Sequence, residues 1–295
     1  MALEGKTKRL IPGSEPGTLI MVTKDELTGG DAAKKATITG IATHKTTQTA
    51  NVFSLLTRHN IPTAYIRKES ETSLLCQDCD MLPLELVMRR YAWGSFLKRE
   101  PQYQRSEPYR FDEIKCEFFH KWAVVMPPLT PAPIQMEENE ARAKYLKDGV
   151  WAEGVYTDPY LRIQGKDWFL HSAKLPVEQA NTLMRTTPVC TEDELSFIVH
   201  KLMLPCFQVL ENAWKTVVTE HGPVVLCDIK IEVGRKKTDG QLVIADVIDN
   251  DSWRIWPGGD PKRQLDKQNF RDGHPLRMVS DNYALVAELT SAFLK

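Results

Sequence analysis

The densest group of chemistry-bearing side chains lies within residues 227–249, where the apolar segments CDIKIEVG and QLVIADVID are joined by a polar link. Asp228, Lys230 and Glu232 alternate with apolar residues, which predicts a strand with the three charges on one face. A five-residue loop would place Glu232 and Asp246 on a shared face as a carboxylate pair for Mg²⁺, whereas a six-residue loop would place them on opposite faces. From the spacing alone, a solvent-facing hairpin with an ion pair is the favoured alternative.

The continuation of this hairpin, residues 249–256 (DNDSWRIW), places two tryptophans around an arginine. The guanidinium of Arg254 offers a planar fork that suits phosphate or carboxylate, and aromatic neighbours can hold such a group in place. This pattern favours a ligand site over a plain loop.

A second basic group lies in residues 89–99 (RRYAWGSFLKR), directly after an apolar segment. A phosphate monoester could be bound there through the backbone N–H of the glycine, the hydroxyl of Ser95 and the charge of Arg89. A basic exposed turn is the alternative. Two weaker signals are residues 5–8 (GKTK), which lack the first glycine and the loop length of a Walker A loop, and the polar turn 24–31 (KDELTGGD).

Cysteine and charge counts exclude several classes of protein. Cys76 and Cys79 form a lone CxxC without the second ligand pair that a structural zinc needs, so a turn between strands is expected. With no apolar signal segment at the N-terminus, we expect free thiols and a cytoplasmic location. The 38 Lys and Arg balance 39 Asp and Glu, which argues against a nucleic-acid binder. No apolar run approaches the ~18 residues of a membrane span.

The elements that must position these residues follow from periodicity and from helix-end signals. We expect strands at 18–23, 63–67 and 84–89 and a helix over about 45–59. A capping box at 191–194 (TEDE) opens a long helix that Pro205 should kink or split.

The last ~20 residues predict a closing helix. Strands in runs, with helices apart from them, favour an α+β fold. We place a domain boundary at 83/84, giving a small β-rich domain (1–83) and a larger α/β domain (84–295). The proline-rich and acidic stretch 122–175 reads as an insertion or mobile surface region.

Taken together and in order, these segments resemble the SAICAR synthetase (phosphoribosylaminoimidazole-succinocarboxamide synthase) family of purine biosynthesis. The matching pieces include 5–8, 24–31, 83–99, 228–234 and 245–256, and residues 266–271 (DKQNFR) complete the set. Several pieces, especially DNDSWR, look like the version in the bifunctional animal enzyme. The resemblance covers most of the chain outside about 122–190.

The resemblance implies an ATP-dependent carbon–nitrogen ligase with ATP in a cleft between the two domains. It would join carboxyaminoimidazole ribonucleotide (CAIR) to L-aspartate through an acyl phosphate, with ATP and Mg²⁺ as cofactors. It also implies a homo-oligomer. Carried over by position, the site residues are Lys230 and Asp31 near the imidazole substrate as catalytic residues; Lys6, Lys8 and Lys121 on ATP phosphates; Arg89, Ser95 and Arg254 on the ribonucleotide phosphate; Lys267 and Arg271 in a loop bordering the site; and Glu232 and Asp246 on Mg²⁺.

The sequence departs from the family at four places. HKWA at 120–123 stands where the family has a lysine followed by acidic residues, and Val247 follows Asp246, the expected metal ligand. The lysine and asparagines expected near Gly40 are missing, and the region around 122–170 is longer. The departures near Lys121 and Gly40 motivate one alternative, a nucleotide-binding protein with a regulatory or assembly role. A phosphotransferase that uses the same ATP cleft on a different acceptor is a further alternative.

Overall fold

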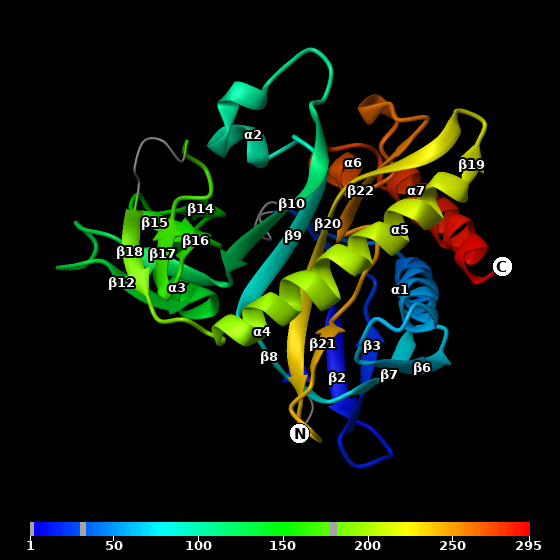
Figure 1. Ribbon diagram of the computed structural model, residues 1–295, viewed down its shortest axis with the longest axis horizontal. Helices are drawn as coiled ribbons and strands as arrows, with labels where there is room; N and C mark the ends of the chain where they lie inside the picture. The colour runs from blue at the N-terminus through cyan, green and yellow to red at the C-terminus, as the bar shows by residue number, and fades with distance from the viewer. Residues whose placement is uncertain (1–2, 30–33, 177–181) are drawn as a thin grey trace. The chain divides into compact units, whose positions relative to one another are not determined.

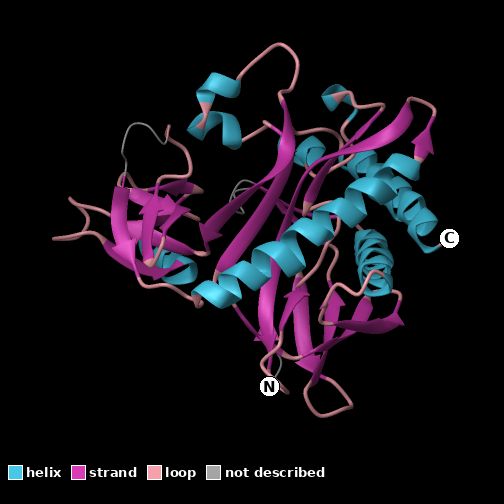
Figure 2. Ribbon diagram, viewed as in Figure 1, coloured by secondary structure: helices cyan, strands magenta, loops and turns pink. Residues whose placement is uncertain are grey.

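The computed structural model describes residues 3–29, 34–176 and 182–295 (Figures 1 and 2). It divides into two compact units. The first unit combines Met1–Met81 with His200–Lys295, and the second unit is Leu82–Val199. The strand ladders are antiparallel, and helices and strands occur in separate runs, which confirms the expected α+β class.

The N-terminal part of the first unit is an antiparallel sheet with the strand order β1-β2-β3-β7-β6. One face of this sheet packs Met21 and Leu74 against Ala50 of the following helix. A separate hairpin, β4–β5, follows the third strand. The bounds are β1 Leu3–Glu4, β2 Lys8–Pro12, β3 Thr18–Thr23, β4 Glu26–Gly29, β5 Lys34–Thr37, β6 Tyr65–Ser70 and β7 Ser73–Gln77.

Helix α1 (Ile41–Arg58) is almost entirely enclosed by the first unit. It begins after Gly40, whose φ of 86° is left-handed and therefore suits glycine. The C-terminal helix α7 (Leu276–Thr290) packs along it, with Tyr283 and Val279 in one core cluster with Ile41. This packing places the C-terminal segment in the first unit.

The C-terminal part of the first unit is built on the long strand β20 (Gly222–Lys236). It pairs with β21 (Leu242–Ala245), β22 (Trp253–Pro257), β8 (Cys79–Met81) and the short β19 (Val218–Thr219). The 3-10 segment η4 (Pro261–Arg263), the short helix α6 (Gln268–Arg271) and η5 (Ser291–Leu294) complete the unit.

The second unit carries an antiparallel sheet with the order β18-β17-β16-β10-β9. The segment expected as an insertion or mobile region has regular structure, with a three-stranded sheet β12-β11-β15 and a core around Ala123, Val125 and Met136. The bounds are β9 Leu84–Tyr91, α2 Phe96–Arg99, η1 Pro101–Tyr103, β10 Arg110–His120, β11 Trp122–Val125, β12 Ile134–Glu137, α3 Glu138–Tyr145, β13 Leu146–Lys147, β14 Val150–Trp151, β15 Val155–Thr157, β16 Tyr160–Gln164, β17 Asp167–His171 and β18 Thr182–Thr186.

The predicted capping box and proline break are both confirmed. The Thr191 hydroxyl accepts from the Glu194 N–H at 3.2 Å, and the Glu194 carboxylate accepts from the Thr191 N–H at 2.9 Å. The long helix is split into α4 (Glu192–Phe197), a π-helical segment (Ile198–Met203) and α5 (Leu204–Thr216), with Pro205 in the first turn of α5. Pro205 has no N–H to donate, so the α-helical pattern cannot continue unbroken through it.

The compact units differ in one respect from the expected division into 1–83 and 84–295. The first junction lies at 81/82, but the chain returns to the first unit at His200 because α7 packs on α1 and β8 pairs with β20. The assignment of ATP binding to residues 1–83 remains a prediction. Within the described ranges, no helix combines the length and apolar character that crossing a membrane requires.

Candidate functional site

The hairpin β20–β21 has the register of the six-residue alternative. Glu232 lies opposite Ala245, and the last ladder pair is Arg235 with Leu242, which leaves residues 236–241 between them. Strand alternation would direct Glu232 and Asp246 to opposite faces. However, β21 ends at Ala245, and Asp246 has a left-handed φ of 64°, so the strand does not set its side-chain direction. This backbone conformation is uncommon for a residue other than glycine, asparagine or aspartate.

Asp246 is ion-paired with Lys8 of β2, so the structure brings together two residues that the sequence assigned to the metal and to ATP. Both side chains are partly exposed. The preceding turn is closed by the Gly5 N–H, which donates to the Lys8 carbonyl at 2.8 Å, and Lys6 is exposed on it. A carboxylate can bind Mg²⁺ while a neighbouring ammonium group contacts phosphate, so this pair suits a metal–phosphate complex.

The charged face of β20 is paired rather than solvated. The Lys230 Nζ lies 3.8 Å from Glu232 Oε1, and an Arg254 terminal nitrogen lies 2.6 Å from Asp228 Oδ2. Glu232 is only 8% exposed and all of β21 is buried, so the solvent-facing alternative is wrong although its ion pair is present.

Arg254 is oriented by a carboxylate and not by its aromatic neighbours. It lies directly opposite Asp228 in the β20–β22 ladder, whereas Trp253 and Trp256 are buried in the core. Burial by itself would lower the pKa of the Arg254 guanidinium, but the negative charge of Asp228 outweighs it and raises that pKa. Arg254 therefore keeps its charge in a half-buried position.

The donor set at the hairpin fits Mg²⁺ held by few protein ligands. Across the described ranges, no group of three or more His, Cys, Asp or Glu side chains could hold a metal ion. Mg²⁺ at a nucleotide site commonly needs only one or two carboxylates, with substrate phosphates and water completing its shell. Glu232 pairs with Ala245, the last residue of β21, and Asp246 follows directly. These two residues could supply the carboxylates.

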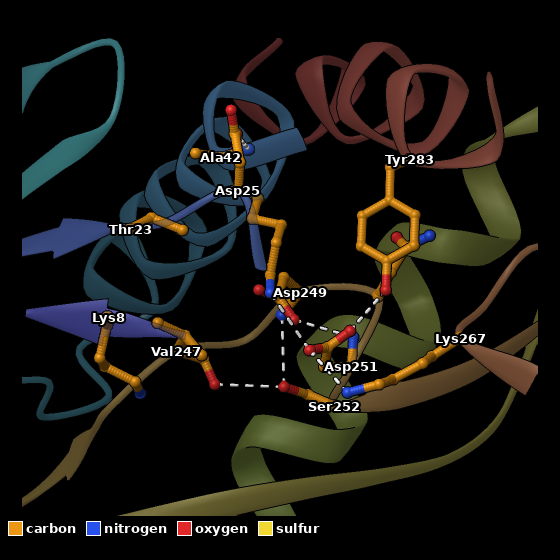
Figure 3. A network of polar contacts seen from close by, with 12 residues as sticks. Lys8, Thr23, Asp25, Ala42, Val247, Asp249, Asp251, Ser252, Lys267 and Tyr283 are labelled. Carbon is orange, nitrogen blue, oxygen red and sulfur yellow. Dashed lines mark hydrogen bonds and ion pairs between the residues drawn. The ribbon is translucent and has the colours of Figure 1, made fainter. Parts of the chain in front are cut away.

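A buried polar network surrounds Asp251, two residues after the end of the predicted strand (Figure 3). Asp251 Oδ1 accepts from the Tyr283 hydroxyl at 2.5 Å, while Oδ2 accepts from Lys267 Nζ at 3.0 Å and from Lys45 Nζ at 3.2 Å. The Asp251 N–H donates to Asp249 Oδ1 at 2.8 Å. One carboxylate thus ties α1, α7 and the loop before α6 together.

The electrostatics of this network favour an ionised Asp251. Burial opposes its charge, but Lys45 and Lys267 lower its pKa far below the usual range. Burial and the charge of Asp251 raise the pKa of Asp249. Lys267 is the only member that the resemblance assigned to the site. The available signal for Lys45 was a lysine on the same helix face as Ile41, Ala42 and Val52.

In the second unit, Arg89 and the turn at Ser95 lie beside a buried carboxylate that the sequence did not single out. Arg89 Nε donates to Glu117 Oε2 at 2.5 Å, and Arg99 donates to Glu117 Oε1 at 2.5 Å. Ser95 is exposed and immediately precedes α2. Lys121 is half-buried, and its backbone N–H donates to the Pro83 carbonyl at 2.9 Å.

The remaining assigned residues are Arg271 and Asp31. Arg271 is exposed on α6 and donates to Gln268 Oε1 at 3.2 Å. Asp31 lies outside the described residues. Cys76 lies in β7 and Cys79 begins β8, with only Asp78 between the two strands, so the segment joins two strands as expected but without a turn. All six cysteines are free thiols. Burial raises the pKa of Cys76 to about 12 and that of Cys79 to about 11, so neither is a ready thiolate.

Residues 1–287 match the family described as SAICAR synthetase. The chain belongs to that family. A phosphoribosylaminoimidazole-succinocarboxamide synthase of Chloroflexus aggregans is 36% identical over 97% of this chain and 94% of its own length. The multifunctional protein ADE2 of Gallus gallus is 34% identical over 99% of this chain, and the match spans 58% of that longer protein.

Solved SAICAR synthetases share the fold. A structure titled SAICAR synthetase (Type-2) in complex with ADP matches with a TM-score of 0.67 and 25% identity, covering 99% of this chain and 97% of the other. The phosphoribosylaminoimidazole-succinocarboxamide synthase of Ehrlichia chaffeensis matches with a TM-score of 0.68 and 22% identity, covering 98% of each chain. The family and the fold expected from the sequence motifs are therefore confirmed.

Proposed function

We propose that the chain is an ATP-dependent ligase of purine biosynthesis that joins CAIR to L-aspartate, giving SAICAR, ADP and phosphate. Family membership over nearly the whole chain supports this proposal, as do relatives that carry the synthase name. The geometric observation that carries it is the ion pair between Lys8 and Asp246, the residues that we propose to bind an ATP phosphate and the metal. The complex of a related structure with ADP supports use of ATP.

The chemistry accounts for the kinds of residues in the site. A carboxylate is a poor electrophile, so phosphoryl transfer from ATP must first activate it, and the amine of aspartate then displaces phosphate. Such a path asks for cations that stabilise migrating negative charge rather than for a covalent nucleophile. Lys6, Lys8 and Lys121 would contact ATP phosphates, while Lys230 and Asp31 would lie near the imidazole ring.

The substrate phosphate and the metal complete the assignment. Arg89, Ser95 and Arg254 would bind the phosphate of the ribonucleotide, and Lys267 and Arg271 would border the site. Mg²⁺, when bound by Glu232 and Asp246, would neutralise charge on the ATP phosphates. We further propose a cytoplasmic homo-oligomer whose partners are its small-molecule substrates rather than nucleic acid or a membrane.

The reaction itself tests the proposal. Purified protein is mixed with Mg-ATP, L-aspartate and CAIR, and the succinocarboxamide and ADP are followed together. Equal amounts of both, abolished when any component is omitted, are the expected result. ATP binding without product would favour the regulatory alternative, and ADP without succinocarboxamide would favour a phosphotransferase.

Glu232→Gln tests the metal ligand. Replacing the carboxylate by an amide removes a charge that Mg²⁺ requires, so turnover should fall at least about tenfold and the Mg²⁺ concentration for half-maximal rate should rise. Glu220→Gln, at an exposed turn before β20, is the matched control and should leave both unchanged. An unaltered Mg²⁺ dependence in Glu232→Gln would remove Glu232 from the metal site.

A further inference from the structure

Four side chains of the second unit lie on one face of its sheet. Glu117 lies opposite Val87 in the β9–β10 ladder, so Arg89, two residues further along β9, is its diagonal neighbour on the same face. Phe119, two residues after Glu117, lies directly opposite Tyr160 of β16. The sheet therefore presents a guanidinium, a carboxylate and two aromatic rings side by side.

Arg99 of α2 covers this face and is 1% exposed. Its guanidinium carbon lies 4.9 Å from the centre of the Phe119 ring and 5.2 Å from that of Tyr160. One terminal nitrogen donates to Glu117 Oε1, and the other donates to the carbonyls of Ser95 at 3.2 Å and Ala173 at 3.0 Å. Arg99 thus connects α2, β10, β16 and the segment after β17.

Two buried arginines meet at one carboxylate on this face. Arg89, 3% exposed, and Arg99 both donate to Glu117, which is 5% exposed. Glu85, which is half-buried, lies directly opposite Phe119 in the same ladder. Buried charged groups are stable only in well-formed hydrogen-bonded pairs, so the geometry of both guanidiniums depends on Glu117.

The bonds also fix the two groups that the proposed function assigns to the ribonucleotide phosphate. Glu117 holds Arg89 by its Nε, which sets the plane of the guanidinium. Arg99 holds the Ser95 carbonyl, which anchors the turn that begins at Gly94, where φ is a left-handed 61°. Phosphate recognition by a guanidinium fork and a hydroxyl depends on the direction of both.

We propose that Arg99 and Glu117 are positioning residues that orient Arg89 and the Gly94–Ser95 turn toward a phosphate monoester, an inference that rests on the proposed function. Neither residue touches the phosphate. Arg99 acts through the Ser95 backbone and through Glu117, and Glu117 acts through Arg89. The pair therefore determines preference for a ribonucleotide over the corresponding ribonucleoside.

Two charge-conserving substitutions test positioning apart from charge. Arg99→Lys keeps the cation but removes the fork that reaches Glu117 and Ser95 together. Glu117→Asp keeps the anion but shortens its reach to the two arginines. Arg105→Lys, where an exposed arginine stacks on Tyr109 at 4.7 Å, and Glu113→Asp, on the exposed side of β10, are the matched controls.

The first readout is calorimetric binding of ribose 5-phosphate, which does not depend on ligase activity. We expect each test variant to bind at least about tenfold more weakly than the wild type, equivalent to about 1.4 kcal/mol, with both controls unchanged. A misfolded fraction lowers the binding stoichiometry, whereas a misplaced site lowers the affinity of the remaining molecules. Wild-type affinity in Arg99→Lys or in Glu117→Asp would overturn the proposal.

The second readout is the ratio of kcat/KM for CAIR to that for its ribonucleoside. A positioning role lowers this ratio and leaves the KM values for ATP and aspartate unchanged, whereas a purely structural role lowers activity on both substrates equally and would refute the inference. If the wild type makes no SAICAR but the variants still bind ribose 5-phosphate more weakly, only the ligase proposal is refuted. SAICAR formation with unchanged ribose 5-phosphate binding would refute the inference alone.

Discussion

At the scale of single residues, Asp251 shows how one half-buried carboxylate can hold separate parts of a site together. Its two oxygens accept from Tyr283, Lys45 and Lys267, which come from α7, α1 and the loop before α6 (Figure 3). Burying a carboxylate is favourable only where such donors surround it. Lys267, which we propose to border the substrate site, is thereby fixed by groups that need not contact substrate.

Asp251→Asn should lower the free energy of unfolding by about 3–5 kcal/mol, because it leaves two buried ammonium groups without their carboxylate. Tyr283→Phe removes a single hydrogen bond to a charged group and should cost about 1.5–3 kcal/mol. The control Asp239→Asn, whose ion pair with Lys236 is exposed to solvent, should leave the free energy of unfolding nearly unchanged. Urea unfolding measures all three, and equal losses in Asp251→Asn and Asp239→Asn would contradict the network.

His120 provides a pH-dependent prediction. It is buried, and burial lowers the pKa of its imidazole from 6.5 to about 4. Between these values the unfolded chain binds a proton that the folded chain does not, so stability falls as the pH drops. At 1.36 kcal/mol per pKa unit, the loss reaches up to roughly 3 kcal/mol.

The substitution His120→Phe isolates this contribution. It keeps a ring in contact with Trp122 but cannot titrate. Between pH 7 and pH 4 the wild type should therefore lose more unfolding free energy than the variant. Parallel stability profiles for the two proteins would show that His120 does not titrate as proposed.

The partners of these residues were not readable from the sequence, although their types were. Lys45 and Asp251 are 206 positions apart, and no local pattern joins them. Arg89 and Ser95 were visible as phosphate-binding types in a short basic segment, but Glu117 lies 28 positions from Arg89 and becomes its neighbour only through strand register. Alternation along a strand predicts which side chains share a face, but it does not predict which residue of the neighbouring strand lies opposite each of them. Ion pairs between strands therefore could not be predicted.

At the scale of elements, periodicity predicted the secondary structure better than the register. The strand expected at 18–23 is β3, and the helix expected over 45–59 is α1, which begins four residues earlier. The alternation of Asp228, Lys230 and Glu232 was correct for β20. The sequence could not decide between a five-residue and a six-residue loop before Asp246. A register shift of one residue moves every side chain of the strand to the opposite face of the sheet.

Two glycines near β20 separate the cost of a left-handed backbone from the cost of a steric clash. Gly240 (φ 74°) and Gly258 (φ 63°) are both left-handed, but an added methyl at Gly240 meets no atom within 4 Å, whereas one at Gly258 would collide with the His221 carbonyl. Gly240→Ala should cost about 1–2 kcal/mol in unfolding free energy. Gly258→Ala should cost about 1–3 kcal/mol more, and equal thermal stability of the two variants would contradict this packing.

At the scale of the whole molecule, the first unit is formed by the N-terminal and C-terminal parts of the chain, and the second unit is formed by the residues between them in the sequence. The sequence suggested a division at 83/84 because a second strong apolar run begins after Pro83. The return of residues 200–295 to the first unit depends on α7 packing against α1, a contact between segments more than 200 residues apart. The family motifs identified the fold correctly because they occur in order in both of the segments that form the first unit and at the start of the second unit.

The central claim is that ATP activates the carboxylate of CAIR for attack by aspartate. The most direct measurement uses CAIR labelled with ¹⁸O in that carboxylate and follows the label by mass spectrometry. If the carboxylate is phosphorylated and phosphate then leaves, one labelled oxygen appears in inorganic phosphate for each SAICAR and each ADP formed. SAICAR formation with unlabelled phosphate, or ADP formation without SAICAR, would contradict the account.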